Sequence, residues 1–186
     1  MEVRNKTLKA LIITGKGVQD HEFIYPYYRL LEAGFKVTVA LEKPEFKQPI
    51  GFYGTNIPPD ENCAVIRYTE LLKEEYSKNF DLLVLPGGAK CMEYLRQNKT
   101  VIDFIHYWNK QGKMIAVICH GAQLLISAKA VRGKKIAAYY SLEDDVVNAG
   151  AEYCSTYCIS QNIYSASHYK HLGEWMKSVI DFFFTF

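Results

Sequence analysis

The sequence predicts an α/β protein, a three-layer sandwich in which a mainly parallel sheet lies between two layers of helices. Three observations predict this fold class. Short apolar runs, of which residues 115–118 are the clearest, have the length of strands that are buried on both faces. Helical patterns alternate with these runs, and glycine-containing turns follow several of them. Strands that alternate with helices form a parallel sheet with both faces covered.

The first half of the chain contains four of the expected strands. Residues 9–14 form an apolar run that ends at a glycine turn. Asp20 can cap the helix that follows, in which apolar residues recur at helical spacing up to Gly34, a typical helix end. Residues 43–62 are rich in proline and glycine and indicate a hairpin or a long loop. The other elements expected here are strands at 35–40, 64–66 and 81–85 and a short helix at 71–76.

The second half continues the alternation. Pro86 and two glycines stop the strand at 81–85. The apolar strand at 115–118 runs almost directly into a helix at 123–129, and Ser141 can cap a later helix. The other elements expected here are helices at 99–112, 141–148 and 172–184 and strands at 135–139, 151–157 and 162–165.

Length and composition indicate one globular domain over residues 1–186, large enough to bury a core. The net charge of +2 is too small to indicate a nucleic acid or an anionic membrane as partner. No apolar stretch is long enough to span a bilayer, so we expect no membrane association. The five cysteines are an odd number without framework spacing, which indicates free thiols and a reducing, cytoplasmic setting.

The segment MIAVICHGAQ, residues 114–123, carries the strongest chemical signal. Cys119 and His120 lie where the apolar strand breaks into a helix, which is the arrangement of a nucleophile elbow. Such a turn exposes the thiol at the carboxyl end of the sheet and directs helix-start N–H groups at it, which favours the thiolate. His120 is a candidate base or proton shuttle. Without this turn, a Cys-His pair would indicate only a structural cysteine beside a surface histidine.

Stretches along nearly the whole chain match one protein family. They include DLLVLPGG, EYLR, AVICHGAQLLISA, VRGKKIAAY and DDVVNAGAEY, and they run from about residue 11 to about residue 176. On these motifs the chain resembles the ThiJ/PfpI family, which includes the parkinsonism-associated deglycase and the PfpI-type intracellular peptidases. The Cys followed directly by His is most similar to the PfpI-type branch. The resemblance implies a flavodoxin-like fold.

The resemblance also implies roles for particular residues. Cys119 matches the family nucleophile, and His120 matches the catalytic histidine of the PfpI-type branch. In that branch a glutamate from a neighbouring subunit completes the triad. Alignment on EYLR places Glu93 there, although GGAKCMEYLR is one residue longer than the family stretch and Met92 would fall there without a gap. The implied oxyanion donors are the backbone N–H groups of Gly88 and His120. Gly87, Gly121 and His168 are further candidates for contact with the substrate.

One departure from the family pattern concerns the first turn. The family motif E-D-x-E before the first helix reads Gln19-Asp20-His21-Glu22 here, which aligns Gln19 with the family glutamate. In the family that carboxyl is protonated and hydrogen-bonds the cysteine sulfur. A glutamine amide can donate to a thiolate but cannot give or take a proton. We therefore expect altered acid–base machinery, with either a redirected or an abolished reaction.

Several other cysteines and histidines require separate interpretation. Cys154 and Cys158, with His168 and His171, suggest a zinc site. However, residues 154–158 resemble a strand, in which even spacing places both thiols on one face, and the spacing is not that of common zinc motifs, so we expect no metal. His168 could supply a proton that Gln19 cannot, although a surface histidine is the simpler interpretation. Cys91 is a candidate redox partner of Cys119 across a subunit interface, or an ordinary loop cysteine.

Two functional hypotheses follow. The first is a cysteine-dependent enzyme without a cofactor, either a hydrolase of amides, peptides or glycated adducts or a glyoxalase-like enzyme, in which Cys119 attacks a carbonyl of a small-molecule or peptide substrate. The second is a non-catalytic thiol redox sensor or chaperone-like stress protein, in which Cys119 is oxidised. The resemblance implies a homodimer or homohexamer, because the role of Glu93 requires a neighbouring subunit.

Overall fold

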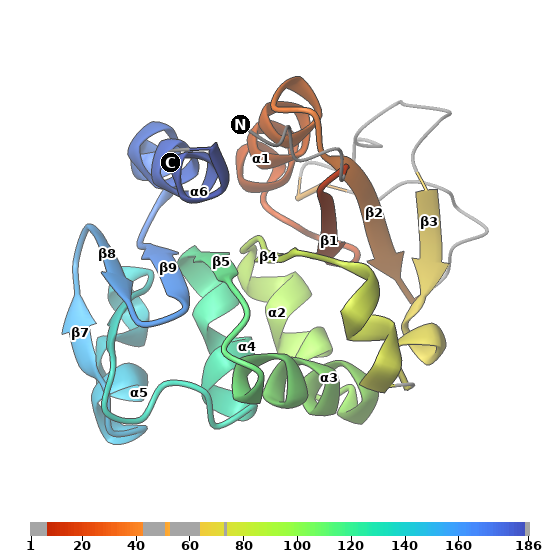
Figure 1. Cartoon of the computed structure of the whole chain (residues 1–186). Helices are drawn as coiled ribbons and strands as arrows, with labels where there is room; N and C mark the ends of the chain where they lie inside the picture. The colour runs from red at the N-terminus through yellow and green to blue at the C-terminus, as the bar shows by residue number, and fades with distance from the viewer. Residues whose placement is uncertain (1–6, 43–50, 53–63, 73, 185–186) are drawn as a thin grey trace.

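The computed structural model of the chain describes residues 7–42, 51–52, 64–72 and 74–184. Its central sheet has seven strands in the order β3-β2-β1-β4-β5-β9-β8, and every neighbouring pair is parallel except β8 and β9 (Figure 1). The strands are β1 (Lys9–Ile13), β2 (Lys36–Leu41), β3 (Ala64–Arg67), β4 (Leu82–Leu85), β5 (Ile115–Ile118), β8 (Tyr157–Ser160) and β9 (Ile163–Ala166).

Helices cover both faces of this sheet. Figure 1 shows α1 (Asp20–Glu32) and α6 (Leu172–Phe184) together on one face, and α2 (Ala89–Leu95), α3 (Lys99–Lys110) and α4 (Ala122–Ser127) on the other. A short parallel pair, β6 (Lys135–Ala137) and β7 (Glu152–Cys154), lies beside the main sheet with α5 (Glu143–Asn148). The short 3₁₀ turns are η2 (Tyr68–Leu72), η3 (Glu74–Asn79), η4 (Cys119–Gly121), η5 (Tyr140–Leu142) and η6 (Tyr169–His171). The predicted three-layer, mainly parallel sandwich is confirmed.

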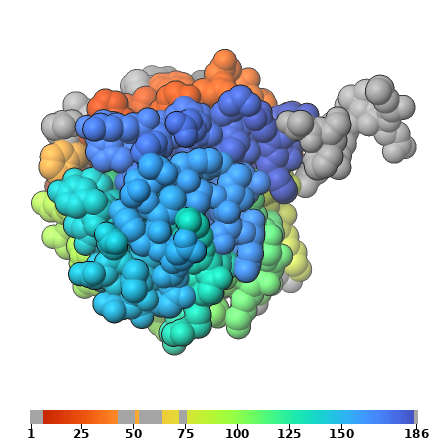
Figure 2. Space-filling view, turned by 90° about the vertical axis from the view of Figure 1, so that its left-hand side faces the viewer, coloured from red at the N-terminus to blue at the C-terminus, as the bar shows by residue number. Residues whose placement is uncertain are grey.

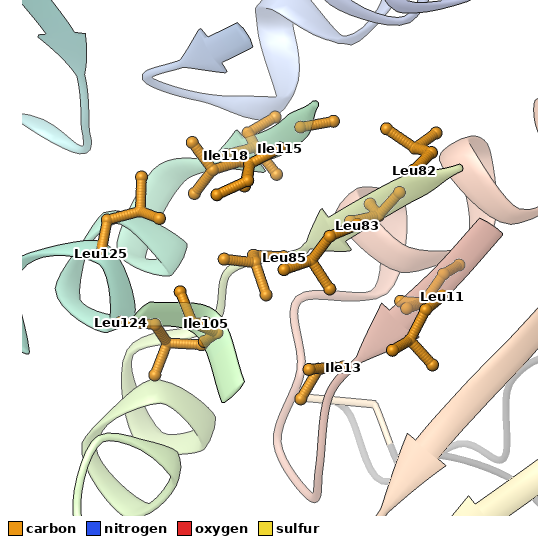
Figure 3. Close-up of a cluster of buried hydrophobic side chains, with 14 of the residues drawn as sticks. Leu11, Ile13, Leu82, Leu83, Leu85, Ile105, Ile115, Ile118, Leu124 and Leu125 are labelled. Atoms are coloured by element: carbon orange, nitrogen blue, oxygen red, sulfur yellow. The ribbon is translucent and has the colours of Figure 1, made fainter. Parts of the chain in front are cut away.

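The core lies between the central strands and the helices on each side. Every residue of β4 and β5 is buried, as expected for strands covered on both faces. Figure 3 shows leucine and isoleucine side chains of β1, β4 and β5 packed with Ile105 of α3 and with Leu124 and Leu125 of α4. The buried indoles satisfy their own polar groups, because Trp108 Nε1 donates to Met114 O at 3.0 Å and Trp175 Nε1 donates to Tyr164 O at 2.9 Å.

The strand order reverses between β1 and β4. From β1 the chain builds the sheet outward through β2 and β3, whereas from β4 it builds in the opposite direction through β5. In open α/β sheets, ligands bind outside the carboxyl ends of the strands near such a switch point. Backbone contacts bring the turns there together, since Gln19 N–H donates to Gly87 O at 3.2 Å. Among the described residues, no helix is both long and apolar enough to cross a membrane.

Two expected helix caps were wrong. The N-cap of α1 is Gln19, whose side chain accepts a hydrogen bond from the Glu22 N–H, while the Asp20 carboxylate accepts from the Phe52 N–H at 3.0 Å. Asp20 is therefore used to tie residue 52 to the helix start. Ser141 lies inside a 3₁₀ turn, and α5 begins after it without a side-chain cap.

The structure also differs from the sequence prediction in two elements. Residues 151–157 are not one strand, because the chain bends at residues 155–156 and places Cys154 on β7 and Cys158 on β8. Helix α2 was not expected, since it begins after Gly88 without a capping side chain. The hairpin or loop expected at 43–62 lies outside the described residues, apart from 51–52.

Candidate active site

The predicted elbow is present. Strand β5 ends at Ile118, and the 3₁₀ turn at Cys119–Gly121 leads directly into α4. Cys119 has a φ of 59°, a left-handed conformation that is uncommon for a residue with a Cβ. Its side chain is nearly buried, with 5% of the residue exposed. Non-glycine residues held in this region cluster at functional sites, because the surrounding structure must enforce the conformation.

Two glycines allow neighbouring backbone to approach the thiol closely. A Cβ on Gly121 would lie 2.5 Å from Leu85 O, so glycine is required where α4 begins against the end of β4. A Cβ on Gly87 would lie 2.8 Å from Cys119 Cβ and 2.3 Å from Glu22 Oε2. Contacts below 3.0 Å are not tolerated without displacement of neighbouring atoms. Gly87 therefore allows α1 and the elbow to meet.

The carboxyl group beside the nucleophile is Glu22, not Gln19. Glu22 is fully buried on the inner face of α1, and its carboxyl contacts the Cys119 thiol and the Gly87 N–H. Neither carboxylate oxygen has a hydrogen bond of standard geometry, so the contact with Cys119 is a close approach between two acidic groups. Gln19 lies at the helix end, where its amide Nε2 contacts His21 Nδ1 at 3.1 Å. The expectation that Gln19 had replaced the acid–base carboxyl is therefore wrong.

Burial governs the protonation of this pair. Desolvation raises the pKa of Glu22 from 4.5 to about 7, against smaller lowering effects of Cys119 and Gly87. Desolvation also raises the pKa of Cys119, and the negative charge of Glu22 raises it further. The backbone N–H groups at the elbow favour the thiolate as the sequence predicted, but burial outweighs them, so the pKa of Cys119 lies above its ordinary value. Cys119 therefore becomes a thiolate when its thiol proton moves to a neighbouring base.

The N–H groups predicted as oxyanion donors face the sulfur. Those of His120 and Gly88 hydrogen-bond Cys119 and favour its charged form. Gly88 adopts a φ of 107°, and a Cβ there would lie 2.6 Å from Gly17 O and 2.7 Å from Gln19 N. The turns after β1, β4 and β5 thus hold these donors by backbone packing.

His120 provides a second base beside the thiol. Its Nδ1 lies 3.3 Å from Cys119 Sγ. Burial lowers the pKa of His120, while the negative charge of Glu93 acts in the opposite direction, so the ring is mainly neutral at pH 7. The Tyr139 ring packs against this imidazole with a centroid distance of 4.7 Å, and the Tyr139 N–H donates to Cys119 O at 3.4 Å.

Glu93 lies on α2, close to the elbow but directed toward solvent. Gln123 Nε2 donates to Glu93 Oε1 at 2.6 Å, and Arg96 Nη1 lies 3.5 Å from the same oxygen. The Glu93 side chain is 56% exposed. Its charge therefore reaches His120 within one chain, while no hydrogen bond between Glu93 and the imidazole is present among the described residues.

His168 lies at the edge of the site, not against the thiol. Its ring is 6.0 Å from that of Tyr139 and 3.8 Å from that of Tyr169, and its Nδ1 accepts from the Lys170 N–H. These aromatic rings extend outward from His120. The described residues contain no group of three or more metal-ligating side chains, and Cys91 is buried beside Thr14 with its pKa raised to about 12 by desolvation.

Sequence reasoning missed Glu22 and Tyr139. Helical spacing contained a signal for Glu22, because Glu22, Phe23, Pro26, Tyr27 and Leu30 all fall on the face that the structure buries. A carboxylate on such a face departs from amphipathic patterning and marks a functional candidate. No comparable signal in the sequence identified Tyr139. Its ring contacts His120 because the chain after β6 passes beside the elbow.

Comparison with known proteins agrees with this geometry. A model described as the DJ-1/PfpI family matches residues 8–181. The chain is 33% identical over 176 residues to "Deglycase PfpI" of Pyrococcus furiosus, covering 93% of this chain and 98% of that protein. It is 35% identical over 144 residues to "Protein/nucleic acid deglycase 2" of Escherichia coli, covering 77% of each.

A solved structure shares the fold. A two-domain protein of Anabaena variabilis, with DJ-1/ThiJ/PfpI-like and ferritin-like domains, superposes with a TM-score of 0.83 at 27% identity. The match covers 94% of this chain and 49% of that longer one.

Proposed function

The chain belongs to the DJ-1/PfpI family, and from that premise we propose that it is a cysteine-dependent hydrolase of glycated adducts, with Cys119 as nucleophile. The observation that carries this proposal is the Glu22 carboxyl, which contacts the Cys119 thiol and has a pKa raised to about 7 by desolvation. A carboxyl with this pKa can both accept and return a proton near neutral pH. Relatives named as deglycases support the substrate class.

The first chemical step is attack on a carbonyl. Proton transfer from Cys119 Sγ to Glu22, or to His120 Nδ1, gives the thiolate, which adds to the substrate's carbonyl carbon. The N–H groups of Gly88 and His120, which hydrogen-bond Cys119, are placed to stabilise the oxyanion that forms.

The later steps require a group that moves protons. In a carbinolamine adduct of a 2-oxoaldehyde, the amine leaves with a proton as the aldehyde carbonyl re-forms, and Cys119 Sγ adds to that carbonyl carbon to give a hemithioacetal. Glu22 then takes the proton from the sulfur-bearing carbon and returns it to the adjacent carbonyl carbon, while the hydroxyl proton passes to the oxygen on that adjacent carbon, and the hemithioacetal becomes a thioester. Water hydrolyses the thioester, releasing a 2-hydroxy acid and the free thiol. A glutamine could not perform this transfer, so Glu22 favours this chemistry over simple amide hydrolysis.

The test is turnover of a defined adduct. Methylglyoxal adducts of N-acetylated arginine or cysteine are incubated with the protein, and the released amino acid and lactate are measured by mass spectrometry. We expect wild-type turnover, with a loss of at least about 100-fold in Cys119→Ser and in Glu22→Gln. Gln19→Ala is the matched control and should retain turnover, because Gln19 caps α1 without contacting the sulfur.

Other results would contradict the proposal. Turnover that persists in Cys119→Ser would exclude Cys119 as the nucleophile. Absence of turnover, together with reversible peroxide oxidation of Cys119, would instead support the thiol-sensor hypothesis.

The proposed assembly is a homodimer or homohexamer in which Glu93 of a neighbouring subunit orients His120. Two features of Glu93 support this role: its side chain is more than half exposed, and only Oε1 is used by Gln123 and Arg96. The second carboxylate oxygen would then serve the imidazole of an adjoining chain.

A further inference from the structure

Two cysteines outside the active site lie together at the turn between β7 and β8. The bend at residues 155–156 brings Cys154 at the end of β7 close to Cys158 on β8. Cys154 Sγ donates to Tyr157 O at 3.5 Å, and that carbonyl belongs to the peptide bond that joins Tyr157 to Cys158. The Cys154 thiol is also near enough to raise the pKa of Cys158, in addition to the larger effect of burial.

The surrounding strands hold both thiols in place. Cys154 pairs with Ala137 of β6, and Cys158 Sγ donates to Lys135 O on the same strand at 3.3 Å. Cys158 also lies opposite Ser165 of β9, with 3.2 Å between Sγ and Oγ. The two cysteines, on β7 and β8, are therefore held by contacts with two further strands, β6 and β9. A disulfide requires the two sulfurs to approach to about 2.05 Å, and both cysteines lie against the same strand, β6.

We propose that Cys154 and Cys158 form an intramolecular disulfide when the protein meets a peroxide, at a modification site separate from Cys119. One thiolate attacks a peroxide oxygen and becomes a sulfenic acid, while the other oxygen leaves as hydroxide. The second thiol then attacks the sulfenic sulfur, the S–S bond forms, and water leaves. The net reaction converts two thiols and one hydrogen peroxide into one disulfide and two waters.

Accessibility and charge distinguish this pair from the other described cysteines. Both thiols are only partly buried, and Figure 2 shows that the chain around residues 150–165, in light blue, forms the surface at this end of the molecule. The ammonium of Lys135, which also pairs with Glu152 at 2.6 Å, lies within electrostatic range of both sulfurs and favours their charged forms, whereas burial raises the pKa of Cys158. Cys91, by contrast, is 1% exposed.

The turn that the disulfide would close also holds the edge of the active site. Ser167 N–H donates to Thr156 O at 2.7 Å, and Ser167 Oγ donates to Ser155 O at 2.6 Å. The next residue is His168, whose ring packs on Tyr139. The bond would therefore close the short loop on which this part of the site rests.

The test uses the wild-type protein. It is treated with hydrogen peroxide, alkylated with iodoacetamide under denaturing conditions, and digested with trypsin. Residues 136–170 contain no lysine or arginine before Lys170, so both cysteines fall in one peptide. We expect this peptide to lose two hydrogens and to accept no alkyl group, and to accept two after reduction. Chymotryptic cleavage after Tyr157, between the two cysteines, should leave its halves joined until reduction.

Matched variants locate the bond. Cys154→Ser and Cys158→Ser should each abolish the protected peptide, whereas Cys91→Ser should leave it unchanged. Full alkylation of residues 136–170 after peroxide treatment of the wild type would overturn the proposal. A crosslink from either cysteine to Cys63, to Cys119 or to a second molecule would overturn it as well.

Discussion

At the residue scale, the main feature is a pair of neighbouring buried acidic groups, the Glu22 carboxyl and the Cys119 thiol. Glu22 is fully buried and Cys119 nearly so; the negative charge of Glu22 raises the pKa of Cys119, whereas the protonated thiol lowers the pKa of Glu22. Two such groups titrate as a pair, whose steps belong to neither residue alone. Above about pH 7 the pair holds one proton, and the reactivity of the thiol depends on whether that proton is on oxygen or on sulfur.

The pH dependence of cysteine alkylation tests this pairing. In the wild type, alkylation of Cys119 by iodoacetamide should increase with pH around about 7, because deprotonation of the pair creates a carboxylate that can accept the thiol proton. In Glu22→Gln the midpoint should move above the free-thiol value of about 8.5, since burial raises the cysteine pKa and the acceptor is gone. Peptide mass spectrometry measures both profiles. Coincident profiles would show that Glu22 does not control the thiol.

The buried carboxylate should also cost stability at high pH. Below pH 4.5 Glu22 is protonated in both the folded and unfolded states; between pH 4.5 and about 7 only the folded state retains the proton. Stability therefore falls as pH rises through this window, by about 3 kcal/mol in total. The free energy of unfolding of Glu22→Gln should exceed that of the wild type by up to that amount at pH 8 and should equal it near pH 4. Urea unfolding at the two pH values measures the difference, and a variant less stable at pH 8 would contradict the account.

Gly87 gives a steric prediction. Alanine at this position would place its Cβ against Glu22 Oε2 and Cys119 Cβ, so Gly87→Ala should destabilise by about 1–3 kcal/mol and reduce Cys119 alkylation. Gly173→Ala in α6 is the control, because its Cβ meets nothing within 4 Å; it should stabilise the helix by about 0.5–1 kcal/mol. Equal effects of the two substitutions in thermal unfolding would refute the argument from close packing.

At the element scale, the start of α1 has two separate functions. Gln19 caps the helix from outside, whereas Glu22, three residues later, faces inward to the thiol. Loss of a side-chain cap costs about 1 kcal/mol, so Gln19→Ala should lower the free energy of unfolding by about that amount. The alkylation profile of Cys119 should not change. A shifted profile would mean that Gln19 acts on the thiol after all.

The sequence predicted best those elements whose local pattern of apolar residues allows one type of secondary structure. Strand β5 and helix α6 have the bounds that the sequence predicted, because an unbroken apolar run and a strongly periodic segment leave few alternatives. The break between β7 and β8 was missed because the turn contains no glycine or proline. The family motif drew attention to Gln19, whereas the carboxyl beside the thiol belongs to Glu22, one helical turn later. The packing of the turns after β4 and β5 against α1 explains why Glu22 is buried.

At the scale of the whole molecule, the fold brings together three turns that are far apart in sequence. The first turn of α1 supplies the carboxyl, the turn after β4 supplies the glycine N–H groups, and the turn after β5 supplies the nucleophile. Their convergence was predictable, since strands of one parallel sheet end at the same edge. The contacts within the site and the protonation of its residues were not predictable from the sequence. Both depend on which side chains are buried, and only the assembled core determines that.

The proposed shared site makes a prediction about assembly. Cys119→Ser and Glu93→Ala chains, each inactive alone, are co-expressed with different tags and isolated as mixed oligomers. We expect partial recovery of adduct turnover, because an intact cysteine then meets an intact Glu93 from the adjoining chain. The control is a mixed oligomer of two kinds of chain, one carrying both Cys119→Ser and Glu93→Ala and the other carrying Cys119→Ser alone. It should remain inactive, because no chain in it has the cysteine. Absence of recovery in the mixed oligomers would place the role of Glu93 within one chain.

The left-handed backbone of Cys119 also bears on the history of such genes. Glycine adopts this conformation at lower cost than any residue with a Cβ, so selection for the nucleophile is what keeps a side chain there. Cysteine and glycine codons differ by one nucleotide. In a lineage released from that selection, a glycine at this position would be both readily reached by mutation and favoured by stability. Its appearance in a related sequence would mark the loss of the chemistry.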